Sequence, residues 1–459
     1  MSMSNPQPCL TLEHYAQRRQ ALLDSMPVGS VALIASGEEQ IRNRDVDYPF
    51  RADSDFLYLT GFEEPDAVLV LIRAEVLEST DMAKPNHQAW LFLRPKDPEQ
   101  ETWEGRRLGV DAAPEKLGLD QAWCLDEINE IAPLFLTNAK QVWFSFAQLD
   151  DWGSTLTEWL GQLKAQVRKG GAVPTHLSDL DQLLHEQRLV KSAAEIALLK
   201  KAAQLSVEGH LAAMRATRPG VYEYQVQSAL EHAFRMQGSA RVAFNSIVAG
   251  GENACILHYT ENNAPLMEGD LVLIDAGAEW QGYAGDISHT YPISGRFNTE
   301  QRLLYELVLA AQQAAIAAIK PGHAYHAMHK ASSQVLTEGL LRLGLLHGEL
   351  NQLIKEEAVK RFFMHGTGHW LGLDVHDVGR YKIDGEWRNF EPGMVVTVEP
   401  GLYISPDSEG IDSKWWGIGI RIEDDVLVTQ DGHEVLTEGL PRTPEEIEQW
   451  MQTEQQITA

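Results

Sequence analysis

Two carboxylates stand at or shortly after the end of an apolar run, a placement that favours chemistry. Residues 271–274 read Leu-Val-Leu-Ile and lead into Asp275, and Asp286 follows after a turn rich in Gly and Tyr. An unbroken apolar run predicts a buried strand, and a carboxylate at its end is costly to bury unless it is paired or metal-bound. A hairpin would bring the two acids together, where they repel each other unless they share a proton or a cation. The pair therefore calls for a metal, with an ordinary polar turn as the alternative.

A Gly-rich segment holds three histidines, His365, His369 and His376, within residues 364–376. Its glycines argue against a helix and let the backbone pass close to another group, so the histidine spacing does not define one helical face. A lone histidine is more often a hydrogen-bonded structural residue. Three of them in so short a segment favour a site.

Two further acids follow the same logic. The apolar run 393–398 ends in Glu399 and a Pro-Gly turn, although an acid at that place could also serve the turn alone. In 417–424, alternation puts the isoleucines on one face and two glycines, Arg421 and Glu423 on the other. We expect the glycines to leave room for a ligand above the sheet. An ordinary cross-strand pair of Arg421 with Glu423 is the alternative.

Together these residues predict a metal-dependent hydrolytic site. Carboxylate oxygens with a few imidazole nitrogens suit Mn²⁺, Mg²⁺, Fe²⁺ or Zn²⁺ rather than a thiolate-bound metal. Four carboxylates balance the charge of two divalent ions, and such a pair acidifies a shared water so that it becomes hydroxide near neutral pH. Other catalytic signatures are poor in this chain, because it has no HExxH, GxSxG or Walker A motif and no strand-borne GxGxxG.

The first part of the chain has strands that alternate with helices. Residues 11–26 fit an amphipathic helix in which Arg18 and Arg19 are expected in solvent, and 154–168 fit another helix. This alternation predicts a three-layer α/β domain with a mixed sheet. The expected strands are 29–34, 56–62, 67–72, 90–93 and 142–146.

The second part combines long helices with alternating strands, an α+β pattern. A turn-rich linker at 169–174 separates it from the first part. Ser192 and Glu195 form a capping box that predicts the start of a helix. Helices are expected over 192–216, 223–237, 299–319, 324–343 and 441–451.

The composition limits the partners. The chain has 459 residues and a formal net charge of −28, which argues against nucleic-acid and anionic-membrane binding and favours cationic amino termini. No secretory signal is visible, and no apolar run approaches the roughly 20 residues of a membrane helix. The three cysteines are far apart and odd in number, which fits a reducing cytoplasm.

The order of these residues and their neighbours resembles a known family. HYTEN (258–262), DAG (275–277), GDI (285–287), HGTGHWLG (365–372), EPG (399–401) and RIEDD (421–425) stand around the candidate ligands. This arrangement resembles the pita-bread metallopeptidases, and within them the bacterial aminopeptidase P branch. The resemblance runs from about residue 48 to residue 448. It implies an N-terminal creatinase/prolidase-like α/β domain over 1–176 and an α+β pita-bread catalytic domain over 177–459.

The resemblance implies a dinuclear-metal aminopeptidase that hydrolyses the Xaa-Pro bond at the N-terminus of peptides. A hydroxide between the metals would attack, Glu399 would take part in proton transfer, and Asp286 and Glu423 would bridge the ions. Two Mn²⁺ ions would be held by Asp275, Asp286, His369, Glu399 and Glu423.

It also implies roles for residues around the metals. His376 would stabilise the tetrahedral intermediate, and His258 and His365 would line the site that receives proline. The remaining assignments concern the substrate and the subunits: Tyr403 and Arg421 match positions near the substrate, Asp45 matches a residue linked to them, and Trp103 matches one that closes the site of a neighbouring subunit in a tetramer. A homo-oligomer, dimer or tetramer, is therefore expected.

One position departs from the pattern. Phe244 stands where the bacterial enzymes can have a tyrosine near a metal ligand, so a phenol hydrogen bond to that ligand would be absent. Three alternatives to the aminopeptidase stay open: a prolidase restricted to Xaa-Pro dipeptides, a catalytically dead binding protein on the same fold, and a metal-free creatinase-like hydrolase. The last two would not need the five ligands.

Overall fold

The computed structural model describes residues 8–74, 87–169 and 172–458. The chain forms two compact units, one spanning Leu10–Arg188 and one that joins the residues up to Cys9 to the chain from Leu189 onward. The predicted boundary after residue 176 falls at β8 (His176–Asp179), which pairs in parallel with β7 (Gln141–Phe144). This pairing makes β8 the edge strand of the first unit. Of the predicted linker, residues 170 and 171 lie outside the described residues.

The first unit is built on a mixed sheet. Its strand order is β6-β5-β4-β1-β7-β8, in which β1 pairs antiparallel with β4 and β4 with β5, whereas the other neighbours are parallel. The central strands are apolar and buried, as expected for a sheet covered on both faces. The strands besides β7 and β8 are β1 (Ser30–Ala35), β4 (Val68–Arg73), β5 (His87–Leu93) and β6 (Gln121–Cys124).

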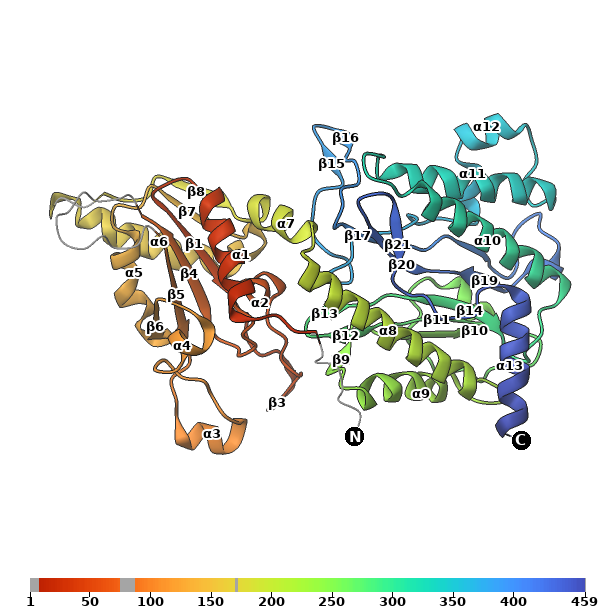
Figure 1. Cartoon of the computed structure of the whole chain (residues 1–459), viewed down its shortest axis with the longest axis horizontal. Coiled ribbons are helices and arrows are strands. Elements are labelled where there is room, and N and C mark those ends of the chain that lie inside the picture. The colour runs from red at the N-terminus through yellow and green to blue at the C-terminus, as the bar shows by residue number, and fades with distance from the viewer. Residues whose placement is uncertain (1–7, 75–86, 170–171, 459) are drawn as a thin grey trace. The chain divides into compact units, whose positions relative to one another are not determined.

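Helices cover this sheet (Figure 1). Phe135 of α5 and Trp159 of α6 pack with Val70 and Phe92 of the sheet, while α1 and α2 contact strands β4 and β1. The predicted three-layer α/β domain is confirmed. Its helices and its small exposed hairpin are α1 (Leu12–Ser25), α2 (Ser54–Thr60), α3 (Pro98–Glu104), α4 (Ala113–Leu117), α5 (Ile128–Leu136), α6 (Leu149–Ala165), α7 (Asp181–Leu189), β2 (Ile41–Asn43) and β3 (Val46–Asp47).

The strand predicted over 56–62 is wrong, because Ser54–Thr60 is helix α2. The Asp53 side chain caps this helix by accepting hydrogen bonds from the backbone N–H groups of Asp55 and Phe56. Gly61 ends it in the left-handed conformation. These end signals outweigh the strand preference of the aromatic residues between them.

The expectation that Arg18 and Arg19 face solvent is also wrong, because their exposed fractions are 7 % and 3 %. Arg18 donates to the carbonyl oxygen of Tyr58 at 3.0 Å, and Arg19 donates to that of Leu59 at 2.8 Å. Both carbonyls lie in the last turn of α2, where the helix leaves them without a partner of its own. The two guanidinium groups therefore cap α2.

Two helix pairs organise the second unit (Figure 1): α8 packs on α9, and α10 packs on α11. Helix α8 begins as predicted with the capping box of Ser192 and Glu195. The helices are α8 (Ala193–Ala216), α9 (Glu223–Met236), α10 (Thr299–Ala318), α11 (His326–Arg342), α12 (Leu350–Lys355) and α13 (Pro444–Thr458).

The strands of the second unit form small antiparallel sheets, which confirms the α+β pattern. A core of buried side chains from the helices and the strands, such as Leu205, Phe234, Ile274, Val308 and Ile420, fixes the strands against the helices. The strands are β9 (Arg241–Val242), β10 (Ile247–Gly250), β11 (Leu271–Asp275), β12 (Ala278–Trp280), β13 (Tyr283–Ala284), β14 (Ser288–Pro292), β15 (Lys382–Ile383), β16 (Glu386–Trp387), β17 (Val395–Val398), β18 (Gly401–Ile404), β19 (Ile418–Arg421), β20 (Asp424–Val428) and β21 (His433–Val435).

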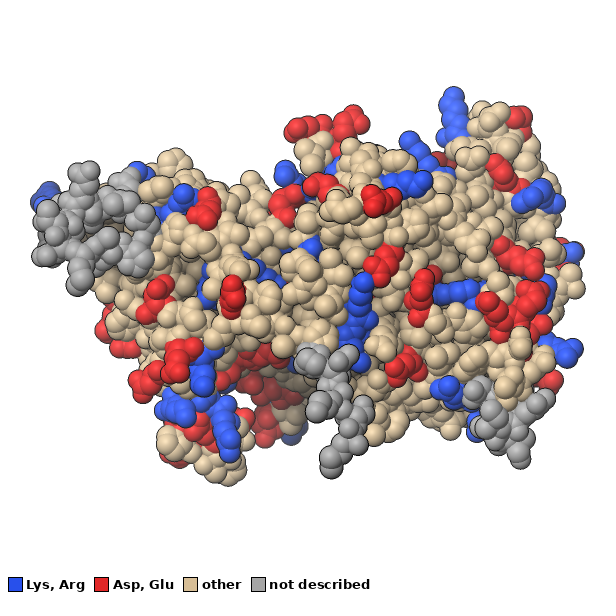
Figure 2. All heavy atoms as spheres, viewed as in Figure 1, with Lys and Arg blue, Asp and Glu red and all other residues tan. Residues whose placement is uncertain are grey.

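Within the described residues, no helix has both the length and the apolar character needed to cross a membrane. On the face shown in Figure 2, the basic side chains are interspersed with acidic ones.

Candidate metal centre

The two aspartates come from one antiparallel pairing. Strand β11 ends at Asp275, which lies opposite Ser288 of β14, and a smaller hairpin of β12 and β13 is inserted between the strands. Asp286 lies just before β14, and its backbone N–H donates to Oδ2 of Asp425 at 3.1 Å. The expected hairpin is thus present, with a second one inside it, and burial together with the neighbouring Asp275 raises the pKa of Asp286.

His369 and Glu399 are brought together by a short extended pairing. The backbone N–H of Thr397 in β17 donates to the carbonyl of His369 at 2.9 Å, and that of Glu399 donates to the carbonyl of Thr367 at 2.8 Å. The Gly-rich segment therefore runs beside β17 and is not helical, as predicted. Its side chains reach the same cavity as the acid after β17.

Glu423 follows β19, and its backbone N–H donates to the carbonyl of Ser288 at 2.9 Å. The prediction that the glycines of this strand leave room for a ligand is wrong at Gly419. A Cβ there would lie 2.3 Å from the carbonyl oxygen of Ala254, so the space is filled by backbone. Arg421 pairs with Asp275 at 2.6 Å, which answers the open question of its partner.

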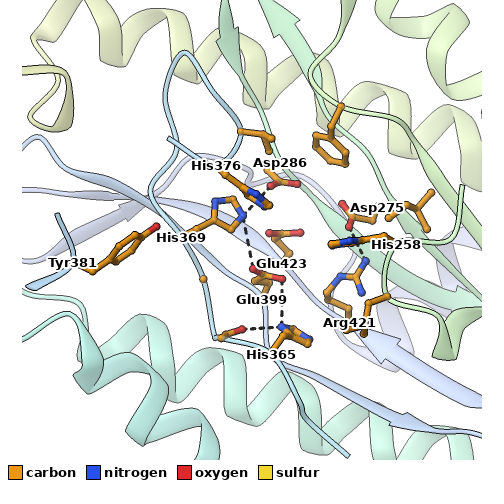
Figure 3. Close-up of a pocket in the computed structure, with 16 residues that line it drawn as sticks. His258, Asp275, Asp286, His365, His369, His376, Tyr381, Glu399, Arg421 and Glu423 are labelled. Atoms are coloured by element: carbon orange, nitrogen blue, oxygen red, sulfur yellow. Dashed lines mark hydrogen bonds and ion pairs between the residues drawn. The ribbon is translucent and has the colours of Figure 1, made fainter. Parts of the chain in front are cut away.

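These elements place the acids and the histidine around one point (Figure 3). Asp286, His369 and Glu423 each offer a ligand atom, and these atoms lie within 4.8 Å of one another. His369 Nε2 lies 3.5 Å from Asp286 Oδ2 and 3.7 Å from Glu399 Oε1. Asp275 completes the group from the side of Arg421, and its Oδ1 is buried with no hydrogen-bond partner among the residues that the structure describes.

The donor set fits divalent cations. Burial, reinforced by neighbouring carboxylates, raises the pKa of Asp286 and of Glu423 well above the ordinary values. Burial also raises the pKa of Glu399. A bound cation relieves the repulsion between these neighbouring carboxylates. His369 Nδ1 lies 3.0 Å from the carbonyl of Trp370, a bond that leaves Nε2 as the metal-binding nitrogen. The buried Oδ1 of Asp275 offers a further ligand atom.

The cavity has a volume of about 460 Å³ and an imidazole-rich wall. His258, His365 and His376 line it, and the ring of His376 lies 4.3 Å from that of His369. Burial lowers the pKa of His365 to about 3. Burial and the neighbouring His369 lower that of His376. Both imidazoles are therefore neutral at pH 7, and the ring nitrogens of His365 lie 2.8 Å from the carbonyl of Gly366 and 2.8 Å from the Tyr403 hydroxyl.

Arg421 connects the cavity wall. Its guanidinium donates to Asp275 at 2.6 Å, to the Tyr403 hydroxyl at 3.0 Å and to Ser288 Oγ at 2.7 Å. The Tyr403 oxygen also lies 2.8 Å from His365 Nε2. Burial raises the pKa of Tyr403 to about 12, so its hydroxyl stays protonated and can donate to His365.

Of the three other residues singled out from the sequence, one lines the cavity and two belong to the first unit. Phe244 lines the cavity but carries no hydroxyl. Asp45 belongs to the first unit, on the exposed turn between β2 and β3. Trp103 is also in the first unit, on α3, and is 84 % exposed.

Three residues of the site had no role assigned from the sequence. Ser288 donates to Glu423 Oε2 at 2.8 Å, and its alternation with Asp286 was the signal for it. Asp425 accepts from the backbone of Asp286 and stands inside the RIEDD motif. Tyr381 lines the cavity, and its hydroxyl accepts from the backbone N–H of Trp370 at 3.1 Å. It lies in an irregular segment, where no periodic pattern could have indicated it.

Comparison with known proteins agrees with this class of site. Residues 197–430 match metallopeptidase family M24, and residues 15–143 match the aminopeptidase P N-terminal domain. The chain is 44 % identical to the Xaa-Pro aminopeptidase of Haemophilus influenzae, over 96 % of this chain and 98 % of that protein. It is 43 % identical to the Xaa-Pro aminopeptidase of Escherichia coli with the same coverage.

The structure is similar to that of the Pseudomonas aeruginosa aminopeptidase PepP, with a TM-score of 0.94, 46 % identity and coverage of 98 % of this chain and 100 % of that one. A zinc-substituted Escherichia coli aminopeptidase P in complex with product matches with a TM-score of 0.93 and 43 % identity over 97 % of this chain and 99 % of that one. A buried cluster of carboxylates and imidazole on this fold defines a metal-dependent peptidase. The chain belongs to metallopeptidase family M24 and carries the N-terminal domain typical of aminopeptidase P.

Proposed function

We propose that the protein is a cytoplasmic aminopeptidase that removes the first residue from peptides with proline in second position, using two Mn²⁺ ions. The observation that carries the proposal is the cavity in which acids and neutral imidazoles meet. It is supported by the near full-length identity with Xaa-Pro aminopeptidases.

The ions would be held by Asp275, Asp286, His369, Glu399 and Glu423. When bound, such ions acidify a water molecule and polarise the carbonyl of the bond to be cut. The oxygen-rich set with one imidazole suits Mn²⁺. Asp286 and Glu423 would help to hold both ions; together with His369 they offer ligand atoms that all lie within 4.8 Å of one another.

The wall of the cavity suits the leaving side of an Xaa-Pro bond. Proline forms a tertiary amide without an N–H, so strand-like peptide recognition fails at this residue. His258, His365 and Tyr403 can instead hold the ring and its carbonyl, because the His365–Tyr403 bond fixes both side chains. The net charge of −28 favours a substrate with a cationic amino terminus.

The chain supplies the proton steps. We assign Glu399 to take a proton at a carboxylate oxygen and return it to the proline nitrogen, which needs a proton to leave. His376, beside His369, would donate a hydrogen bond to the oxygen that becomes negative during attack. The family resemblance assigns Asp45 of the first unit a role on the substrate side, and we carry that role over as part of this proposal.

A substrate series tests the proposal. Purified protein with added Mn²⁺ is given Xaa-Pro-Yaa, Xaa-Pro and Xaa-Ala-Yaa peptides, and release of the first residue is measured. If the proposal is correct, the protein hydrolyses Xaa-Pro-Yaa best of the three peptides. Hydrolysis of the Xaa-Pro dipeptide but not of Xaa-Pro-Yaa would identify a prolidase. Binding without hydrolysis of any of the three would identify a non-catalytic protein.

A further inference from the structure

A fully buried carboxylate of α9 that takes no part in the candidate metal centre holds one wall of the cavity. Glu223 is the first residue of α9 and has an exposed fraction of 0 %. Its Oε1 accepts from the backbone N–H of Gly250 at 2.8 Å and from Asn253 Nδ2 at 3.0 Å. Its Oε2 accepts from the Tyr259 hydroxyl at 2.9 Å and from the backbone N–H of Ala264 at 2.9 Å.

These four donors all belong to one segment, 250–264, which connects β10 to the region before β11. The bonds to Gly250 and Ala264 close the segment at its base, and the other two fix its interior. His258, which lines the cavity, lies in this segment next to the held Tyr259. Glu223 thus sets the path of the backbone that carries His258.

The hydrogen bonds match a carboxylate side chain at this position. Its two oxygens each accept two hydrogen bonds, whereas an amide presents one acceptor and one donor group. Tyr259 is kept in its donor form, because burial and the hydrogen bond to Glu223 raise its pKa to about 12. Glutamine in place of Glu223 would set an NH₂ group against two donors.

The next turn of α9 also forms a hydrogen bond with segment 250–264. Asn262 Nδ2 donates to Gln227 Oε1 at 3.0 Å and to the carbonyl of Ser246 at 2.8 Å, and Asn262 Oδ1 accepts from the backbone N–H of Val248 at 2.9 Å. Gln227 lies four residues after Glu223, so both face the segment from one side of α9. The polar face of α9 therefore serves the cavity wall.

We propose that Glu223 is a positioning residue for His258 and so determines how the proline side of the substrate is held. This inference rests on the proposed function, in which His258 contacts that side. A carboxylate that merely stabilised the fold would affect the melting temperature but would not act through His258.

The test compares Glu223→Gln with a matched control, Glu195→Gln. Glu195 is also a buried carboxylate, 3 % exposed, and accepts from Tyr283 at 2.9 Å and from Ser192 at 2.8 Å and 2.9 Å. Glu223→Gln lowers kcat/KM on an Xaa-Pro-Yaa peptide by on the order of 10-fold at unchanged metal content, as expected for misplacing a substrate-binding group. Glu195→Gln lowers only the melting temperature. Tyr259→Phe, which removes one of the four bonds, gives a smaller loss of kcat/KM and serves if Glu223→Gln does not fold.

A double-mutant cycle with His258→Ala gives the decisive readout. If Glu223 acts through His258, Glu223→Gln or Tyr259→Phe costs little more in the His258→Ala background. An equal loss in both backgrounds would overturn the proposal.

Hydrogen exchange of the backbone amides in 250–264 measures how firmly Glu223 holds this segment, independently of enzymatic activity. Exchange there rises in Glu223→Gln and not in Glu195→Gln, and unchanged exchange would equally overturn the inference. Failure of the proposed function has a different signature, since the wild-type protein itself would leave Xaa-Pro-Yaa uncut.

Discussion

His376 shows how a residue beside a metal centre can be separated from its ligands. It is exposed, lines the cavity, and has its ring 4.3 Å from that of His369. Although the residue as a whole is exposed, the partial burial of its ring and the nearby His369 lower its pKa, so it is a neutral hydrogen-bond donor at pH 7. This position fits a group that serves the transition state and not the ions.

We therefore expect His376→Ala to keep its metal and to lose activity mainly in kcat, by on the order of 10²–10³-fold, the usual cost of removing one such donor. The melting temperature should stay near that of the wild-type protein, because an exposed side chain contributes little packing. Metal content, melting temperature and kcat are measured on one preparation. A lowered melting temperature with wild-type kcat per folded molecule would make His376 a structural histidine.

At the residue scale, the acids of the site could be predicted because a carboxylate after a buried strand needs a partner. The same reasoning failed where the partner is backbone. Arg18 and Arg19 looked like solvent-facing charges, yet both are buried on carbonyls of α2. The room expected beside Gly419 is filled by the backbone of Ala254. Such long-range backbone partners leave no pattern in the local sequence.

At the scale of elements, long helices with clear end signals were the most predictable features. Helix α8 starts at the predicted capping box, and α9, α10 and α11 lie close to their expected ranges. Short elements were less predictable, because α2 is too short for its helical period to show among aromatic residues. The edge strands β6 and β8 were not predicted, since each has only four residues, too few to show a periodic pattern, and β8 carries a single apolar side chain.

Charged side chains link α2 to α7 in the first unit. Asp55 of α2 lies 3.1 Å from His185 and 2.7 Å from Arg188 of α7, and Asp181 lies 3.6 Å from His185. Burial alone would raise the pKa of Asp55, but His185 and Arg188 lower it overall. Burial alone would lower the pKa of His185, but Asp55 and Asp181 raise it overall.

This linkage predicts how the stability of the first unit depends on pH. The Asp55 contribution exists above its ordinary pKa of about 3.9 and is lost in acid, whereas the His185 contribution exists below about 6.5 and is lost as pH rises through the raised folded pKa. The pair thus stabilises most between about pH 4 and pH 6.5. Burial raises the pKa of the nearby Asp53 to about 6, so most of its ionisation precedes the loss of the His185 proton.

The measurement is the melting temperature of the wild-type protein and of His185→Gln from pH 5.5 to 8.5. The wild-type protein should lose stability over the alkaline half of this range, and the variant should lose less. Parallel curves for the two proteins would show that His185 does not carry this dependence.

At the scale of the whole molecule, the fold class was predictable because strands alternate with helices along the first part of the chain, whereas the second part combines long helices with alternating strands. The arrangement of subunits is not contained in one chain. We expect a homo-oligomer, because Trp103 is a large apolar side chain that is 84 % exposed on α3. An indole so exposed is typical of a protein interface.

Light scattering at assay concentration should give a mass of two or four chains, and Trp103→Ser should shift the protein toward smaller species. The substitution lies outside the candidate metal centre, so metal content should not change. A fully active monomer of the wild-type protein would contradict the expected assembly.

The central claim is that Asp275, Asp286, His369, Glu399 and Glu423 hold the ions on which peptide hydrolysis depends. It is tested by removing metal with a chelator and titrating Mn²⁺ back while hydrolysis of an Xaa-Pro-Yaa peptide is followed. Activity should vanish on removal and return in full at about two equivalents per chain, the number that four carboxylates balance. Asp286→Ala should bind less metal and recover little activity. Full hydrolysis by metal-free protein, or an unchanged titration of Asp286→Ala, would contradict the account.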